Sequence, residues 1–229
     1  MIKRIRLMSY TVADDRRAAA WRAAATAALS APADVRPVRA AACTALPDIL
    51  PDPRFDAIGL EWFADAAHLA RFASWLASPQ GAAVGEALSG AEPGTGPVIV
   101  AREHALRGAD WLERRWREGG ARLKHMAIAR RAAGLTAAEF SDRWRSRAGR
   151  AGTVPIPERA RGRAYVQNHP LPRVGADWAY DAVNEVYFDD LAGLRTRIDW
   201  FAEHFDGVGE DDLVGESWFV AVREEALSP

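Results

Sequence analysis

The sequence predicts an α+β protein in which two tandem ferredoxin-like repeats, each of order βαββαβ, form a pseudo-dimeric α/β barrel. Three observations lead to this prediction: an internal repeat, the same order of strand and helix patterns in both halves, and an apolar sheet face in each half that must be buried. An antiparallel four-stranded sheet with helices on one face leaves its other face open. A second copy of the sheet in the same chain can bury that face.

The internal repeat is visible in two pairs of segments. Residues 56–65 (DAIGLEWFAD) match residues 181–190 (DAVNEVYFDD), and the downstream aromatic and leucine positions keep the same spacing of 125 residues. Residues 100–106 (VAREHAL) echo residues 221–227 (AVREEAL) at a spacing of 121, as expected if loop lengths differ. Two such units indicate a duplication rather than a solenoid. We expect a degenerate, structural repeat at 1–106, a helical connector at 107–121 and a repeat with the functional site at 122–229.

The first half follows the repeat pattern loosely. The sequence predicts strands at residues 2–9, 38–46, 57–63 and 98–104, and helices at 14–30 and 66–77. Residues 80–97 are rich in glycine and alanine, which is typical of a loop or a short helix. Residues 107–120 read as a helical connector that ends at Gly119 and Gly120.

The second half carries clearer signals. A strand is predicted at residues 123–130, and Thr136 with Glu139 forms a capping box that starts a helix running through Trp144, with Leu135 and Phe140 as its hydrophobic staple. Strands follow at 163–169 and 182–188, the first closed by prolines. Residues 191–204 form an amphipathic helix with Leu191, Leu194, Ile198 and Phe201 on one face. The last strand, 213–222, is rich in aromatic and β-branched residues.

Composition excludes several classes of protein. Thirty Lys and Arg residues balance 31 Asp and Glu residues, so the composition lacks the excess of positive charge that is typical of nucleic-acid-binding proteins. Cys43 is the lone cysteine, which rules out an intrachain disulfide, and we expect it to be a buried, inert thiol. The five histidines show no metal-binding spacing, so no metal is expected. No long apolar segment occurs, so the expectations are no membrane partner and a cytoplasmic location.

A family resemblance rests on the second half. Residues 165–169 (YVQNH), 124–131 (KHMAIARR), 134–136 (GLT), Glu139-Phe140 and Trp144 resemble the EthD family, over roughly residues 122–225. This resemblance implies the dimeric α/β-barrel superfamily, which includes cofactor-free monooxygenases, cyclases, lyases, isomerases and some haem enzymes. The family often has a His a few residues after the Trp. Here residues 145–149 (RSRAG) follow Trp144, so chemistry that depends on that His is not implied.

The two repeats differ in chemistry at matching positions. Tyr165, Gln167 and His169 correspond to Ala40, Ala42 and Thr44, and Asn184 and Glu185 correspond to Gly59 and Leu60. Buried polar groups need hydrogen-bond partners. A strand with this many polar residues therefore either hydrogen-bonds them to other protein groups or lines a pocket. We therefore place the candidate cavity in the second half, between its sheet and its helices. Strand alternation puts Tyr165, Gln167 and His169 on one face and Asn168 on the other.

Roles follow from residue chemistry. His169 is the candidate general acid/base, and Tyr165 or Asn168 would polarise a substrate oxygen. Substrate contacts are expected from a set of polar and aromatic side chains: Gln167, His125, Asn184, Trp144 and Trp218. Each of these has a structural alternative, namely a satisfied hydrogen bond or core packing. Glu185 is expected to face solvent rather than orient His169.

The leading functional hypothesis is a cofactor-free lyase, cyclase or isomerase that does acid/base chemistry on a small hydrophobic, aromatic or polyketide-like substrate. One alternative is a cofactor-free or haem-dependent monooxygenase that uses the same cavity. The other is a non-catalytic small-molecule-binding accessory protein. The absence of GxGxxG, P-loop and GxSxG motifs makes a nucleotide cofactor or a hydrolase triad unexpected. Substrate identity and a homodimer stay open.

Overall fold

The computed structural model describes residues 1–9, 15–89, 95–146, 150–151, 154–173, 175, 177–204 and 212–228. Its long strands are β1 (Ile2–Met8), β2 (Arg39–Ala45), β3 (Ala57–Phe63), β4 (Thr95–Arg107), β5 (Arg122–Arg131), β8 (Ala164–Pro170), β9 (Ala182–Phe188) and β10 (Val214–Ala226). Its helices are α1 (Asp15–Ala28), α2 (Ala66–Leu76), α3 (Ala82–Ser89), α4 (Ala109–Glu118), α5 (Ala137–Ser146), α6 (Glu158–Arg161) and α7 (Leu191–His204). The short strands β6 (Arg150–Ala151) and β7 (Val154–Pro155) pair separately.

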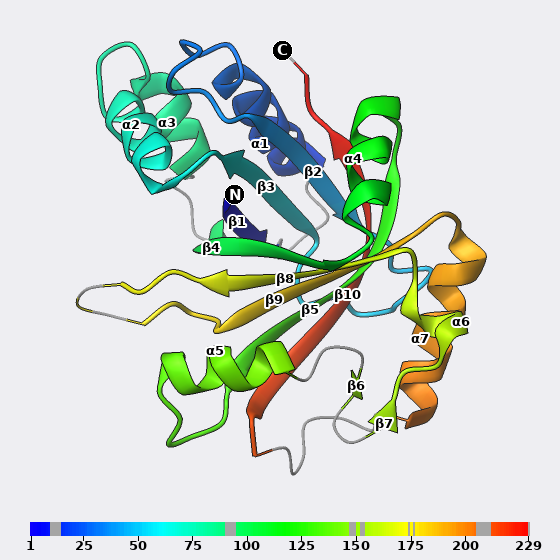
Figure 1. Ribbon diagram of the computed structural model, residues 1–229. Coiled ribbons are helices and arrows are strands. Elements are labelled where there is room, and N and C mark those ends of the chain that lie inside the picture. Colours follow the sequence, from blue (N-terminus) through cyan, green and yellow to red (C-terminus); the bar gives the residue numbers. More distant parts are fainter. Residues whose placement is uncertain are drawn as a thin grey trace.

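The eight long strands close into an antiparallel barrel in the order β1-β3-β2-β10-β5-β9-β8-β4 (Figure 1). Each half supplies one four-stranded sheet, β4-β1-β3-β2 or β10-β5-β9-β8, and the sheets join at β2–β10 and at β4–β8. The predicted pseudo-dimeric α/β barrel is confirmed. Because the sheets pair at both edges as well as facing each other, the barrel has no open strand edge.

The strands that join the halves are longer than the sequence predicted. β4 pairs with β1 through residues 95–102 and with β8 through residues 101–107. β10 likewise pairs with β5 through residues 214–224 and with β2 through residues 222–226. The extra residues at the C-terminal ends, 105–107 and 223–226, pair with the other repeat, whereas Thr95 extends the pairing of β4 with β1. The start predicted for the first helix, Asp14, lies outside the described residues, and α3 matches the short-helix alternative given for residues 80–97.

The start of α5 confirms the predicted capping box. The Glu139 carboxylate accepts hydrogen bonds from the Thr136 backbone N–H at 2.8 Å and from its hydroxyl at 2.7 Å, and Thr136 Oγ1 accepts from the Glu139 N–H at 3.2 Å. Leu135 packs beside buried Phe140, as the staple requires. These contacts fix where α5 begins and therefore which of its side chains reach the sheet.

One end of the barrel interior is apolar and the other is charged. Ile5, Leu7, Ile58, Met126 and Ile128 belong to the apolar part. At the other end α4 lies across the opening, where Trp111 and Leu112 pack on Val166 and Tyr187. Trp116 of the same helix meets Trp62 edge to face, with ring centroids 5.2 Å apart.

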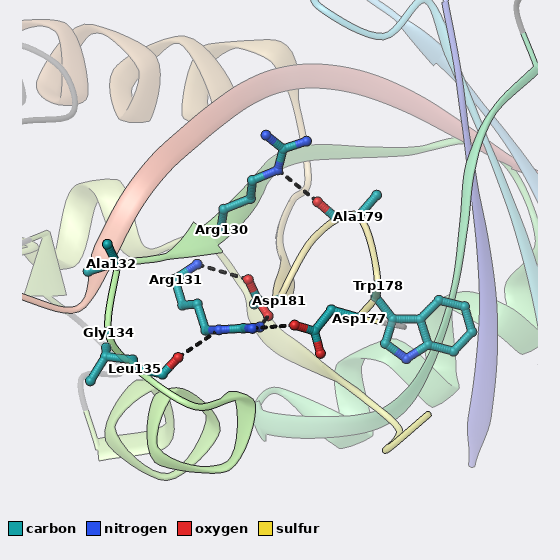
Figure 2. A pocket seen from close by; sticks show the side chains of 10 residues that line it. Arg130, Arg131, Ala132, Gly134, Leu135, Asp177, Trp178, Ala179 and Asp181 are labelled. Carbon is teal, nitrogen blue, oxygen red and sulfur yellow. Dashed lines mark hydrogen bonds and ion pairs between the residues drawn. The ribbon is translucent and has the colours of Figure 1, made fainter. Parts of the chain in front are cut away.

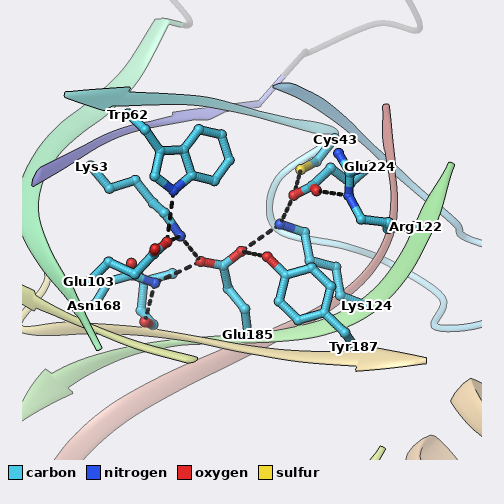
Figure 3. A network of polar contacts seen from close by, with 11 residues as sticks. Lys3, Cys43, Trp62, Glu103, Arg122, Lys124, Asn168, Glu185, Tyr187 and Glu224 are labelled. Carbon is cyan, nitrogen blue, oxygen red and sulfur yellow. Dashed lines mark hydrogen bonds and ion pairs between the residues drawn. The ribbon is translucent and has the colours of Figure 1, made fainter. Parts of the chain in front are cut away.

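Beneath α4 lies a group of ionised side chains that we call the buried charge cluster: Lys3, Glu103, Arg122, Lys124, Glu185 and Glu224 (Figure 3). Glu185 is at its centre, because one carboxylate oxygen binds Lys3 and the other binds Lys124. Tyr187 also donates to Glu185, at 2.9 Å. The prediction that Glu185 faces solvent is wrong, since its side chain is fully buried inside the barrel.

The buried charge cluster has no net charge, and most of its members come in equivalent pairs from the two repeats. Lys3 and Lys124 are equivalent positions of the two repeats, as are Glu103 and Glu224, and each lysine pairs with the glutamate of its own repeat. Burial alone would raise the pKa of Glu185, but Lys124 and Lys3 outweigh it and hold that pKa well below its usual range. Cys43 lies 3.9 Å from Glu224 and is buried as expected, and burial raises the pKa of its thiol to about 12.

Candidate functional site

The outer face of β8 carries the strongest candidate residues. Tyr165, Gln167 and His169 point away from the barrel interior toward the helices of the second half, whereas Asn168 points inward. In Figure 1, α5 and α7 lie against the strands of this half and α1 to α3 against those of the first. The sequence did not indicate which face of the strand meets the helices. In the structure it is the face that carries His169.

A continuous chain of hydrogen bonds, which we call the relay, links Ser141, His169, Gln167 and Tyr165. Ser141 Oγ lies 2.8 Å from His169 Nδ1, and His169 Nε2 lies 3.0 Å from Gln167 Oε1. Gln167 Nε2 donates to the Tyr165 hydroxyl at 3.0 Å and to the Trp144 carbonyl at 3.3 Å. Because the glutamine uses its Nε2 there, its Oε1 accepts from His169 Nε2–H. Nδ1 then holds the lone pair and accepts from Ser141.

The relay contains a neutral imidazole. Burial lowers the pKa of His169 to about 4, and the nearby Arg145 and His104 charges act in the same direction. His169 is therefore unprotonated and able to accept a proton at pH values near neutrality. Ser141 is only half-buried, so its hydroxyl is the member of the relay next to His169 that a ligand can reach.

The middle of this sheet face is lined by Asn184 and Trp144. The Trp144 indole N–H donates to Asn184 Oδ1 at 3.1 Å. Strand pairing places Ala127, Asn184 and Gln167 side by side across β5, β9 and β8. Ala127 is partly exposed although its strand lies inside the sheet, so the helices do not cover this position completely.

His125 occupies the end of this face nearest α7. It stacks on Phe219 at 5.2 Å and meets Phe201 edge to face at 5.4 Å. The Arg197 guanidinium donates from Nε to His125 Nδ1 at 2.9 Å. Burial and that guanidinium lower the pKa of His125 well below its usual value, so this imidazole is neutral as well. Aromatic rings therefore flank the face on two sides, as suits a flat ligand.

Two predicted site residues lie elsewhere. Asn168 turns into the barrel, where its Nδ2 donates to Glu185 at 2.8 Å and to the Val183 carbonyl at 2.9 Å. Trp218 packs on the interior cluster and meets Tyr180 edge to face at 5.2 Å. Strand alternation explains both, because each is one position out of phase with the outer face. Neither side chain can act together with His169.

The equivalent face of the first half is filled. A Cβ atom on Gly59, the counterpart of Asn184, would lie 2.1 Å from the Trp21 ring. Trp21 of α1 therefore presses its ring directly against the backbone of β3. The first repeat uses an indole where the second has the hydrogen-bonded pair Trp144 and Asn184.

Gly59→Ala is expected to destabilise the protein by about 1–3 kcal/mol, the usual cost of overpacking a rigid ring. Urea unfolding followed by tryptophan fluorescence measures the change. The control is Gly193→Ala in α7, where an added Cβ comes no nearer than 3.3 Å to another atom and the backbone is not left-handed, so little loss of stability is expected. A Gly59→Ala protein as stable as the parent would contradict the close approach of Trp21.

Ser141, Arg197 and Phe201 belong to the site, but the sequence did not assign them to it. The sequence did indicate that Arg197 is buried, because it lies one turn from Leu194 and Phe201 on the apolar stripe of a predicted amphipathic helix. Leu191, expected on that stripe, is 39% exposed. Ser141 had no signal, since its partner comes from a distant strand.

A pocket of about 320 Å³ lies at another place, between the β5–α5 turn and the connection from β8 to β9 (Figure 2). Arg131 pairs there with Asp177 and Asp181, and Arg130 donates to the Ala179 carbonyl at 2.8 Å. None of the predicted site residues lines it. Its arginines are already paired, so the arrangement ties α5 to the neighbouring connection.

Within the described ranges, no three His, Cys, Asp or Glu side chains are grouped as metal ligands are. Across the same part of the chain, no helix is long and apolar enough to cross a membrane.

Comparisons with known proteins bear on the fold. No family model and no curated protein matches this sequence, so membership of the EthD family is not confirmed. An anthrone oxidase-like protein matches 100% of this chain and 94% of its own, with a TM-score of 0.53 and 10% identity. Two proposed monooxygenases match 99% of this chain with TM-scores of 0.48: one from Lactobacillus acidophilus NCFM (13% identity, 95% of that chain) and one from Fusobacterium nucleatum (9%, 92%). At such identities the likeness establishes the α/β-barrel fold alone.

Proposed function

We propose that this protein is a cofactor-free oxygenase or oxidase of the EthD-like type, acting on a flat, weakly acidic aromatic or polyketide-like substrate. The observation that carries the proposal is the neutral imidazole of His169, hydrogen-bonded to the half-buried hydroxyl of Ser141. A base that is unprotonated at neutral pH and lies next to aromatic side chains suits proton removal from an activated carbon or a phenol. The second repeat is the catalytic one in this proposal.

Such a reaction needs only a base and molecular oxygen. For anthrone, the substrate methylene gives up a proton through Ser141 to His169 Nδ1. The resulting carbanion passes an electron to O2, and recombination forms a C–O bond as a hydroperoxide. Loss of water then leaves a carbonyl, so that anthrone and O2 yield anthraquinone and water. The substrate supplies the electrons, and His169 returns the proton that completes the water.

The name of the anthrone oxidase-like neighbour favours oxygen chemistry over the lyase, cyclase or isomerase reading. Both readings share the same first step, because an isomerase or cyclase also starts by removing a proton beside a carbonyl. They differ in what the carbanion meets next. Oxygen dependence therefore separates the two.

The test is oxygen uptake by the purified full chain with anthrone, in the presence of a chelator. We expect one O2 consumed per anthraquinone formed, at a rate proportional to protein concentration and above that of heat-denatured protein. A Soret band that tracks activity would instead indicate the haem-dependent alternative. Deuterium exchange into anthrone without oxygen uptake would overturn the oxygenase proposal and favour the isomerase class. Absence of both would favour a binding protein.

A further inference from the structure

Arg197 is a buried cation whose hydrogen-bond partners are neutral. Its side chain is buried between α7 and the sheet, where Nε donates to His125 Nδ1 at 2.9 Å and Nη1 donates to the Ala160 carbonyl at 2.7 Å. Within the part of the chain that the structure describes, no carboxylate lies at ion-pair distance from it. Burying a charge without an opposite charge is costly.

A second arginine increases that cost. Burial lowers the pKa of Arg197 most, Tyr165 opposes this, and Arg107 lies close enough to lower the pKa further, so that it falls to about 9. The Arg107 guanidinium is held by the Arg161 and Gly162 carbonyls, which are also neutral. Two neighbouring cations with carbonyl partners create a positive potential at this end of the face.

Tyr165 lies beside both arginines and can add a hydrogen bond. Its hydroxyl accepts from Gln167 Nε2 at 3.0 Å, and among the described residues it donates to none. Arg197 Nη2 also has no described acceptor. A phenolic O–H and a guanidinium N–H are therefore both available to one incoming anion, and charge-assisted hydrogen bonds of this kind are the strong ones.

From this arrangement we propose that Arg197, with Arg107 and Tyr165, forms a subsite for an anionic group at the far end of the substrate. The ligand class is an aromatic carboxylate or phenolate. Tyr165 and His169 lie on the same outer face of β8 and both bond the Gln167 amide, so Arg197 and Ser141 flank one stretch of that face. A fused-ring molecule lying there would direct an anion on an outer ring toward Arg197 and the acidic C–H of its central ring toward Ser141 and His169. The subsite deepens the proposed function, on which the assignment of the reacting end rests.

The test compares two probes that differ in charge: anthraquinone-2-carboxylate and the neutral anthraquinone-2-carboxamide. Their Kd values are measured by quenching of tryptophan fluorescence. The parent protein is expected to bind the carboxylate at least about tenfold more tightly, since a hydrogen bond to a charged group is worth about 1.5–3 kcal/mol. Arg197→Met should bring the ratio to about one, whereas Arg195→Met, which changes an exposed residue on the same helix, should leave it unchanged.

Equal affinities of the parent for the two probes would overturn the subsite, as would an unchanged ratio in Arg197→Met. If Arg197→Met does not fold, His125→Phe replaces it, because a phenyl ring fits between Phe201 and Phe219 but cannot orient the guanidinium. The ratio should then fall at least about threefold, the weakening expected for a misplaced hydrogen bond. A binding ratio does not depend on turnover, so failure of the subsite and failure of the oxygenase proposal give different results.

Discussion

Glu185→Leu is expected to lower the free energy of unfolding by about 3–5 kcal/mol, because it leaves buried ammonium groups without their shared carboxylate. Lys3 and Lys124 both bind Glu185, and all three side chains are fully buried. Neither lysine can turn to water, so each either stays charged with fewer opposite charges around it or gives up its proton, and both outcomes cost free energy. Urea unfolding, monitored by circular dichroism, gives the change from the shift in midpoint.

Two further variants test the cause. Lys124→Met with Glu185→Leu removes one charge of each sign and leaves the pairs Lys3–Glu103 and Arg122–Glu224 intact. This double variant is expected to be more stable than Glu185→Leu alone, although it has lost more ion pairs. Glu216→Leu, which breaks the exposed pair with Arg130, should cost less than about 1 kcal/mol. A Glu185→Leu protein no less stable than Glu216→Leu would show that the cluster does not depend on its central carboxylate.

His169→Gln is expected to reduce the rate of oxygen-dependent anthrone turnover about 10²–10⁴-fold, the usual contribution of a positioned general base. Glutamine preserves a hydrogen-bonding side chain between Ser141 and Gln167 but cannot accept a proton near neutral pH. We expect the loss in kcat, with little change in KM, because His169 is nearly buried and binds the relay rather than the ligand.

The matched control is His204→Gln, at the end of α7, where the imidazole contacts the Trp200 carbonyl and ring rather than the relay. Its turnover should equal that of the parent. Both variants must unfold at parental urea concentrations, so that a loss of rate is not a loss of fold. Parental turnover by His169→Gln would remove the general base from the proposed mechanism.

The fold was predictable because local and repeat signals agreed. The 125-residue spacing identified equivalent strands, and the Thr136–Glu139 capping box set the start of α5, as the structure confirms. Strand ends were less predictable, since the extra residues at the C-terminal ends of β4 and β10 pair with the opposite repeat. No local pattern records a partner that lies in the other half of the chain.

The site was predictable only in part. Alternation along β8 grouped Tyr165, Gln167 and His169, and the structure brings them together with His125, Asn184 and Trp144 on one outer face. The alternation pattern did not show which face of each strand is the barrel interior, and Asn168 and Trp218 lie on that face. Nor did the sequence reveal the buried charge cluster, because a lysine in a strand usually faces solvent. The matching lysines at Lys3 and Lys124 were the available signal, together with Glu103 and Glu224.

A crystal structure of the full chain with anthraquinone-2-carboxylate tests the central claim most directly, because it locates the ligand without relying on turnover. The prediction is density over Ala127 and Asn184 between α5 and α7, with a central-ring carbonyl toward Ser141 and the carboxylate at Arg197. Density in the pocket beside Arg131 and Asp177, or on the face of the first repeat covered by Trp21, would contradict the assignment of the site to the second repeat.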